Sequence, residues 1–230
     1  MLIRTGEART QRMDLGLAGL LSLVAGALNA AGFVVAGSFT ANQTGNLSMV
    51  SETLVQGQVL LALSFAGLVL AFITGAALAA LGIQWGERLG VRETYALAVA
   101  AEAAILLGLG ALLAATGGPA ETHVVIVLSF VMGLQNAVTT VISRARVRTT
   151  HVSGMATDIG IELAALLGSP RLRDEARPKL ALHSLTLACF AVGGVLGTLA
   201  YAIVGHWLFT ATGVLLAAIA LPELALARRD

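Results

Sequence analysis

The sequence is poor in charged residues, aromatic residues and cysteine. Only 12% of its 230 residues are charged and 5% are aromatic, whereas a soluble domain carries about 25% charged residues. The single cysteine, Cys189, excludes a disulfide framework and a thiolate metal cluster. A net charge of +1 excludes the strongly basic surface with which proteins bind nucleic acid. The composition is therefore not that of a soluble domain or of a nucleic-acid-binding protein.

Long apolar segments take the place of the missing charge. Hydrophobic residues make up 57% of the chain and the mean hydropathy is +0.86. About 20 apolar residues cross the hydrocarbon core as a helix, and a helix satisfies all of its own backbone hydrogen bonds. Six runs have this length, and we expect each to be a transmembrane helix: Leu15–Val35, Val59–Gln84, Thr94–Ala115, Thr122–Ser143, Leu180–Val204 and Trp207–Leu226.

The positions of the basic residues predict the orientation in the membrane. All 14 Lys and Arg residues lie before the first run, between the second and third, between the fourth and fifth, or after the sixth. The other three connections contain none. Because basic connections stay on the cytoplasmic side, we expect both chain termini to be cytoplasmic, with residues 1–14 forming an N-terminal tail.

The two halves of the chain share one plan. Residues 26–30 (Gly-Ala-Leu-Asn-Ala) interrupt the first run, and residues 133–137 (Gly-Leu-Gln-Asn-Ala) interrupt the fourth. A polar segment and two further apolar runs follow in both halves. A unit of three crossings that is repeated once must appear in opposite orientations. We therefore predict an all-α membrane domain (15–226) built as a 3+3 inverted repeat of residues 15–115 and 122–226.

Two short segments complete this plan. Asn46–Gln56 and Met155–Leu167 are helix-like but too short and too polar to cross the membrane. Arginines on both sides of the second segment place both of its ends on the cytoplasmic side. We expect re-entrant or interfacial helices that start at Thr44 and Ser153, because Thr and Ser are favoured N-cap residues and a helix N-terminus offers free N–H groups.

Residues 26–46 and 133–162 resemble the YoaK-type family of bacterial inner-membrane proteins, which is catalogued as a domain of unknown function. The resemblance covers residues 13–225. It implies a six-helix protein of the bacterial cytoplasmic membrane with no assigned activity. That family often has an aspartate where Asn29 stands in this chain, so the resemblance gives Asn29 no proton-carrying role.

Several amide and hydroxyl side chains lie in or beside the apolar runs. Burying an amide without a partner costs about 2–7 kcal/mol, so these side chains must face partners or water. They could form interhelical hydrogen bonds, or they could line a polar substrate path at the repeat interface. Two matching motifs favour the path, for which the candidates are Asn29, Asn42, Gln43, Thr44, Asn46, Gln135, Asn136, Thr150, Ser153 and Gly154.

Four titratable residues are candidates for proton coupling. Glu102 lies near the centre of the third run, where an ionised acid costs at least about 2.5–3.5 kcal/mol and no Lys or Arg in a run can pair with it. A protonated glutamate bonded to a neighbouring helix explains it equally well. Asp158 and Glu162 share one helix face, and His151 precedes them. These three could form a proton relay or pair with the nearby arginines.

No motif of a catalytic, cofactor or metal site is present. We therefore expect no enzyme and no cofactor, and the partners we expect are the lipid bilayer and a small solute. Three function classes stay open, of which a channel, which needs a continuous pore, is the third beside the two that follow. The first is a small secondary transporter that moves a small polar or ionic solute by alternating access, coupled to protons through Glu102 or through Asp158 with His151. The second is a non-transporting membrane scaffold or partner-binding subunit.

Gly193 and Gly197 are four residues apart in the fifth run and permit close helix approach, either within one chain or in a dimer. Half of a larger transporter type is also built from three-helix inverted repeats. By this analogy, a homodimer could supply the second half.

Overall fold

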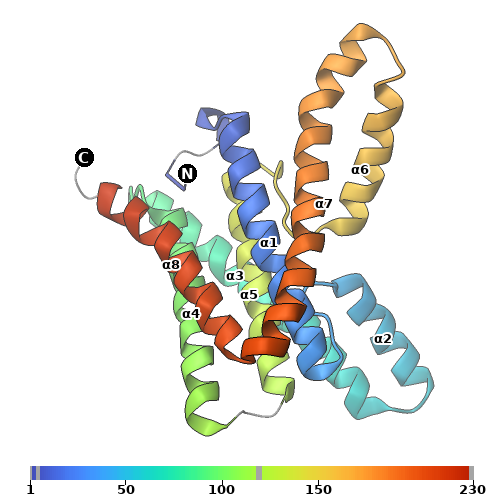
Figure 1. Ribbon diagram of the computed structural model, residues 1–230, viewed down its shortest axis with the longest axis vertical. Helices are drawn as coiled ribbons and strands as arrows, with labels where there is room; N and C mark the ends of the chain where they lie inside the picture. The colour runs from blue at the N-terminus through green and yellow to red at the C-terminus, as the bar shows by residue number, and fades with distance from the viewer. Residues whose placement is uncertain (1, 4–5, 118–120, 228–230) are drawn as a thin grey trace.

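The computed structural model describes residues 2–3, 6–117 and 121–227, and these residues form helices and connecting segments without a strand. A short 3-10 helix, η1 (Gly6–Ala8), precedes eight α-helices (Figure 1). They are α1 (Gln11–Ala36), α2 (Gln43–Val55), α3 (Val59–Arg88), α4 (Thr94–Thr116), α5 (Glu121–Ile142), α6 (Val152–Ala165), α7 (Pro170–Val204) and α8 (Trp207–Ala227).

Six of these helices, α1, α3, α4, α5, α7 and α8, are long and apolar enough to cross a membrane. The chain is therefore a multi-pass membrane protein, and the six predicted spans are confirmed as helices. Their ends agree closely with the prediction except at the start of α7, which begins at Pro170 instead of Leu180. The apolar run marks only the part that fits hydrocarbon, whereas Ser169 caps the helix by accepting a hydrogen bond from the Leu172 N–H.

The most extensive helix pairs are α1 with α7, α3 with α5, and α4 with α8. In the first pair, glycines allow the two backbones to touch. A Cβ atom added at Gly26 of α1 would collide with the carbonyl of Phe190, and one added at Gly193 of α7 would collide with the carbonyl of Leu23. Gly197 faces α1 in the same way. These glycines therefore serve close packing within one chain.

The pair of α3 with α5 uses glycines in the same manner. A Cβ atom at Gly75 of α3 would collide with the carbonyl of Phe130, and one at Gly133 of α5 would collide with the carbonyl of Phe72. In the third pair, Gly110 of α4 faces Thr210 of α8. In each long pair the two backbones thus lie in contact. The resulting van der Waals attraction stabilises the pair in lipid, where the hydrophobic effect does not drive helices together.

The short helices α2 and α6 pack on α3 and α7, and each forms a hairpin with the longer helix that follows it (Figure 1). The prediction that Thr44 and Ser153 start these helices is wrong. The N-cap residues are Asn42, whose side chain accepts a hydrogen bond from the Gly45 N–H at 3.1 Å, and His151. Gly45 and Gly154 leave room for the Asn42 and His151 side chains, so these glycines follow the helix starts instead of marking them.

One end of the bundle collects the basic residues of the described chain. The N-terminal segment, the α3–α4 turn, the α5–α6 loop, the first half of α7 and the last turns of α8 all lie there, in the upper half of Figure 1. Hydrogen bonds join these segments, from Leu2 N to Glu223 Oε2 at 3.3 Å and from Gln11 Nε2 to the Pro178 carbonyl at 3.4 Å. We call this end the basic end.

Candidate functional site

A cavity of about 980 Å³ lies at the basic end, between the start of α1, the α5–α6 loop, α6 and the first half of α7. The buried residues of its wall include Met155 of α6 and Leu182 and Thr186 of α7. Its volume is within the range of pockets that bind small molecules. The cavity exists because α7 begins ten residues before its apolar run and so gives α6 a partner along its length.

The wall contains a buried contact between a carboxyl group and a histidine, which joins α6 to α7. The Glu162 carboxyl is 6% exposed, and its two oxygens lie 2.9 and 3.2 Å from His183 Nδ1. The sequence predicts that Glu162 either forms a relay with His151 and Asp158 or pairs with nearby arginines, and it does not predict His183 as the partner. The missing information was the early start of α7, which brings residue 183 beside α6.

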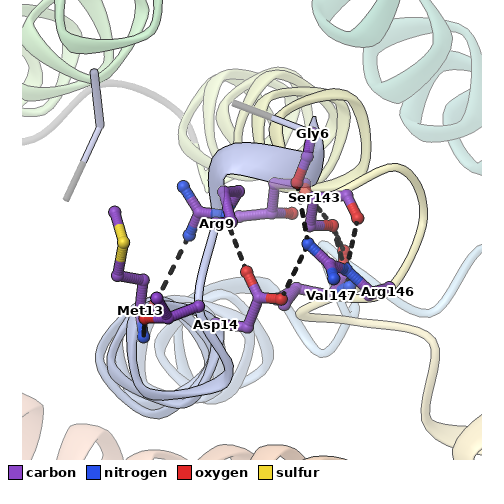
Figure 2. Close-up of polar contacts among 9 residues, drawn as sticks. Gly6, Arg9, Met13, Asp14, Ser143, Arg146 and Val147 are labelled. Atoms are coloured by element: carbon purple, nitrogen blue, oxygen red, sulfur yellow. Dashed lines mark hydrogen bonds and ion pairs between the residues drawn. The ribbon is translucent and has the colours of Figure 1, made fainter. Parts of the chain in front are cut away.

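A second cluster of charges joins the N-terminal segment to the α5–α6 loop (Figure 2). Asp14, 3% exposed, accepts from Arg9 Nε at 2.7 Å and lies 3.1 Å from a terminal nitrogen of Arg146. Arg146 also donates to the backbone carbonyls of Ser143 and Gly6, at 3.0 and 3.1 Å. Because Asp14 and Arg146 line the cavity, this cluster forms part of its wall. The basic residues were noted from sequence, but their acidic partner was not.

The α1–α2 connection folds back into the helix bundle. The Ala41 N–H donates to Asn29 Oδ1 of α1 at 2.9 Å. The Ser129 hydroxyl of α5 lies 3.0 Å from the Thr40 carbonyl oxygen and 2.8 Å from that of Leu68 in α3, and can donate to either. Gln43 Nε2 donates to the same Thr40 carbonyl at 2.9 Å. Asn29 and Gln43 therefore hold the connection in place.

The α5–α6 connection is held in a comparable way by Gln135. Its Nε2 donates to Glu102 Oε1 of α4 at 3.0 Å, and its Oε1 accepts from the Thr149 hydroxyl at 3.3 Å. All three side chains are fully buried. Glu102 Oε2 and the Oδ1 atom of the neighbouring Asn136 are buried and have no hydrogen-bond partner among the residues that the structure describes. Two candidates that were predicted in separate roles, Glu102 and Gln135, thus touch each other.

The cavity does not collect all of the predicted site residues. Of the path candidates only Gly154 lines it, whereas three of the four coupling candidates do, namely His151, Asp158 and Glu162. Asn46 donates to the Phe39 carbonyl at 3.0 Å, and Thr44 and Ser153 are exposed. The polar site between the two motifs stays a prediction. In the described part of the chain no group of three His, Cys, Asp or Glu residues could hold a metal ion.

Residues 17–221 match the family described as Protein of unknown function (DUF1275). The chain belongs to this family. The match covers both motifs and all six long helices, and the YoaK-type resemblance is consistent with it. No curated protein and no solved structure matches the chain. Membership of the family therefore gives no activity, and a function has to be argued from the site.

Proposed function

We propose that this protein is a small secondary transporter of the bacterial cytoplasmic membrane, which moves a small polar or ionic solute by alternating access. The observation that carries the proposal is the cavity at the basic end. It reaches Thr186, seven residues beyond Lys179, the last basic residue of α7. At 1.5 Å per residue this is about 10 Å into the apolar part of the helix. The cavity therefore extends from the charged surface of the basic end into the apolar part of α7.

A 3+3 inverted repeat is part of this proposal, and the glycine contacts support it. Aligning Gly26 with Gly133 also aligns Leu23 with Phe130, because each pair is three residues apart. Aligning Gly193 with Gly75 likewise aligns Phe190 with Phe72. The contact of α1 with α7 then becomes the contact of α5 with α3 when the halves are exchanged.

The third helix pair supports the same relation. Exchanging the halves maps α4 onto α8, so their contact maps onto itself. Gly110 of α4 faces Thr210 of α8, and Gly213 of α8 faces Leu107 of α4. The two positions on each helix are again three residues apart. Exchanging the halves thus converts the α1–α7 contact into the α3–α5 contact and leaves the α4–α8 contact unchanged, as expected for a repeat in opposite orientations.

We also propose that α2 and α6 are re-entrant. Asn29 lies seven residues before the end of α1, and Leu68 nine residues after the start of α3. The connection that they contact therefore lies about 10–14 Å inside the bundle. Gln135 lies seven residues before the end of α5, which puts its contact with Thr149 at a comparable depth from the other end. Each short helix then begins inside the membrane and runs outward.

The two hairpins differ in a way that suits alternating access. The hairpin of α6 and α7 borders the cavity, whereas Thr40 and Ser129, where the hairpin of α2 and α3 begins, are fully buried. In this interpretation the structure is open toward the basic end, which we place in the cytoplasm. The opposite state is reached when the two hairpins exchange conformations.

Proton coupling is the least constrained part of the proposal. Glu102 is fully buried and does not line the cavity, whereas Asp158 and Glu162 do. A group that exchanges a proton during transport needs contact with water in at least one state. We therefore place coupling at Asp158 or at the Glu162–His183 pair.

Counterflow in proteoliposomes tests the function. We expect at least one solute from a panel of small polar metabolites to show saturable counterflow. Glu162→Gln should reduce it by about tenfold or more, because the wall loses its buried carboxylate. Glu52→Gln, at the exposed end of α2, is the matched control. If the protein is folded and no solute of the panel shows counterflow, the transporter is refuted. A flux that rises linearly with solute concentration would indicate a channel.

One observation favours the second function class, a membrane scaffold. The amides of Asn29, Asn46 and Gln135 all have backbone or side-chain partners within the chain. If these amides only stabilise the fold, Asn29→Leu lowers stability and no solute changes the stability of either protein. A solute that stabilises the wild-type protein would favour the transporter instead.

A further inference from the structure

We propose that the cavity at the basic end binds a small molecule that carries both an ammonium group and an anionic group, either a carboxylate or a phosphate. The inference rests on the proposed function in taking the same cavity as the site, and it adds the chemical class of the ligand. It follows from the charged side chains of the wall and from which of them already have a partner.

Most acidic groups of the wall are already paired within the chain. Asp14 binds Arg9 and Arg146, and Glu162 binds His183. On α7, Glu175 accepts from Arg171 Nε at 2.9 Å. Each of these carboxylates therefore already has a partner within the chain.

Three charged side chains of the wall have no hydrogen bond or ion pair in the described part of the chain. They are Asp158 on α6, Arg148 in the α5–α6 loop and Lys179 on α7. The cavity therefore offers one negative and two positive groups, and they come from three different elements. Since an arginine guanidinium binds carboxylate and phosphate oxygens in a fork, Arg148 and Lys179 suit an anionic group, and Asp158 suits an ammonium.

Ligands with only one kind of charge fit this wall less well. A simple amine would leave Arg148 and Lys179 without a partner and would be repelled by them. A simple carboxylate would satisfy these two cations but would face Asp158. A dipolar molecule pairs with all three groups. Between the charges, Met155, Ile161 and Leu182 give the wall apolar side chains that suit a short hydrocarbon part.

The same pair of groups occurs in two sources, a free amino acid and the head group of an ethanolamine phospholipid. The chemistry required of the site is identical, so both sources enter the test. The soluble probes are γ-aminobutyrate, with butylamine and butyrate as matched molecules that lack one charge each. O-phosphoethanolamine and a short-chain phosphatidylethanolamine represent the head group.

The experiment measures binding of these probes to the purified full-length protein in dodecyl maltoside, by the shift of its thermal unfolding. We expect a dipolar probe to bind at least about tenfold more tightly than butylamine and butyrate, since one charge-assisted hydrogen bond is lost with each. If the short-chain lipid binds at least about tenfold more tightly than γ-aminobutyrate, the natural source is a lipid. If it does not, the source is a soluble metabolite. Either result supports the inferred chemistry.

Two variants with matched controls locate the binding. Asp158→Asn and Arg148→Gln should each weaken the dipolar probes by about tenfold or more, and Asp158→Asn should also abolish their advantage over butyrate. Asp174→Asn and Arg88→Gln change the same residue types outside the cavity wall and should leave affinity within about twofold.

The inference is overturned if no probe binds, or if butyrate binds as tightly as the dipolar probes and Asp158→Asn has no effect. This failure differs from a failure of the proposed function. Counterflow of an uncharged or singly charged solute would leave the transporter standing while refuting the dipolar ligand.

Discussion

Among single residues, Gln135 joins two helices and a connecting segment. Its amide joins Glu102 of α4 to Thr149 of the α5–α6 connection from a position on α5. An amide can do this because it presents a donor and an acceptor on one planar group. The fully buried network therefore depends on Gln135 to satisfy a carboxyl and a hydroxyl that hydrocarbon cannot solvate.

Removing this amide should destabilise the protein through the partners that it leaves behind. We expect Gln135→Leu and Glu102→Leu each to lower the free energy of unfolding by about 1–3 kcal/mol, because each leaves a buried polar group unpaired. The double variant should cost less than the sum, since both partners are then gone. Unfolding in mixed dodecyl maltoside and SDS micelles measures this cycle. Additive effects would show that the two side chains do not interact.

The sequence predicted that Asn29 and Gln135 need partners, but it could not name them. The partner of Asn29 is the backbone N–H of Ala41, and this contact arises only after the α1–α2 connection folds back. Glu102 and Gln135 are 33 positions apart, on helices whose packing a single sequence does not give. A polar side chain in an apolar run shows that a partner is needed, but only the packing of the helices shows which group that partner is.

Between elements, packing depends on glycines that face a backbone. Gly133 is the clearest case, because a Cβ atom there would collide with the carbonyl and Cα of Phe72. Gly67, by contrast, lies on α3, and beyond its own stretch of helix no described residue comes within 4 Å of an added Cβ. The two positions differ in contact and not in secondary structure.

This difference predicts opposite results for one substitution. Gly133→Ala should lower the free energy of unfolding by about 1–3 kcal/mol, because α5 and α3 must separate to admit the methyl group. Gly67→Ala should be neutral or stabilising by up to about 1 kcal/mol, since alanine favours a helix more than glycine does. Thermal unfolding followed by fluorescence measures both. Equal effects would mean that the close α3–α5 contact does not form.

The sequence predicted the long helices well and the short ones less well. The length of each apolar run determines whether it can span the membrane. The number of spans and their approximate limits therefore follow from the positions of the apolar runs alone. The limits of α2, α6 and the start of α7 depend on caps such as Asn42 and Ser169, which compete with other plausible starts. A usable signal was overlooked at Phe72 and Phe190, since each is followed three residues later by a glycine that packs against another helix.

Across the whole molecule, the buried acid Asp14 links the N-terminal segment to the α5–α6 loop at the basic end. Asp14 contacts Arg9, whose side chain is fully buried, and Arg146, whose side chain is 45% exposed (Figure 2). The cluster connects the N-terminal segment and α1 to the α5–α6 loop. It therefore fixes one half of the chain against the other beside the cavity.

The different exposures of the two arginines predict different costs. Asp14→Asn should lower the free energy of unfolding by about 1.5–3 kcal/mol, because it removes a buried, charge-assisted hydrogen bond between the carboxylate and Arg9 Nε. Arg146→Gln should cost less than about 1 kcal/mol, since solvent screens that pair. Unfolding in mixed micelles at low and high salt measures both. A larger loss from Arg146→Gln than from Asp14→Asn would refute this description of the cluster.

The central claim is that the two hairpins open to opposite sides of the membrane. Cysteine reactivity tests it most directly, in a Cys189→Ser background that removes the native thiol. Thr157→Cys reports on the cavity, and Ser129→Cys, a change of similar size, reports on the buried contact with the α1–α2 connection. A membrane-impermeant maleimide is applied to inverted and right-side-out vesicles, and SDS-unfolded protein gives the full reactivity of each thiol.

We expect Thr157→Cys to react only from the side of the basic end, in inverted vesicles. Ser129→Cys should react more slowly and only from the opposite side, because its site opens when the hairpins exchange. A ligand that slows one reaction should change the other in the opposite direction. If Thr157→Cys reacts while Ser129→Cys is unreactive from both sides, the cavity is a fixed pocket and alternating access is refuted.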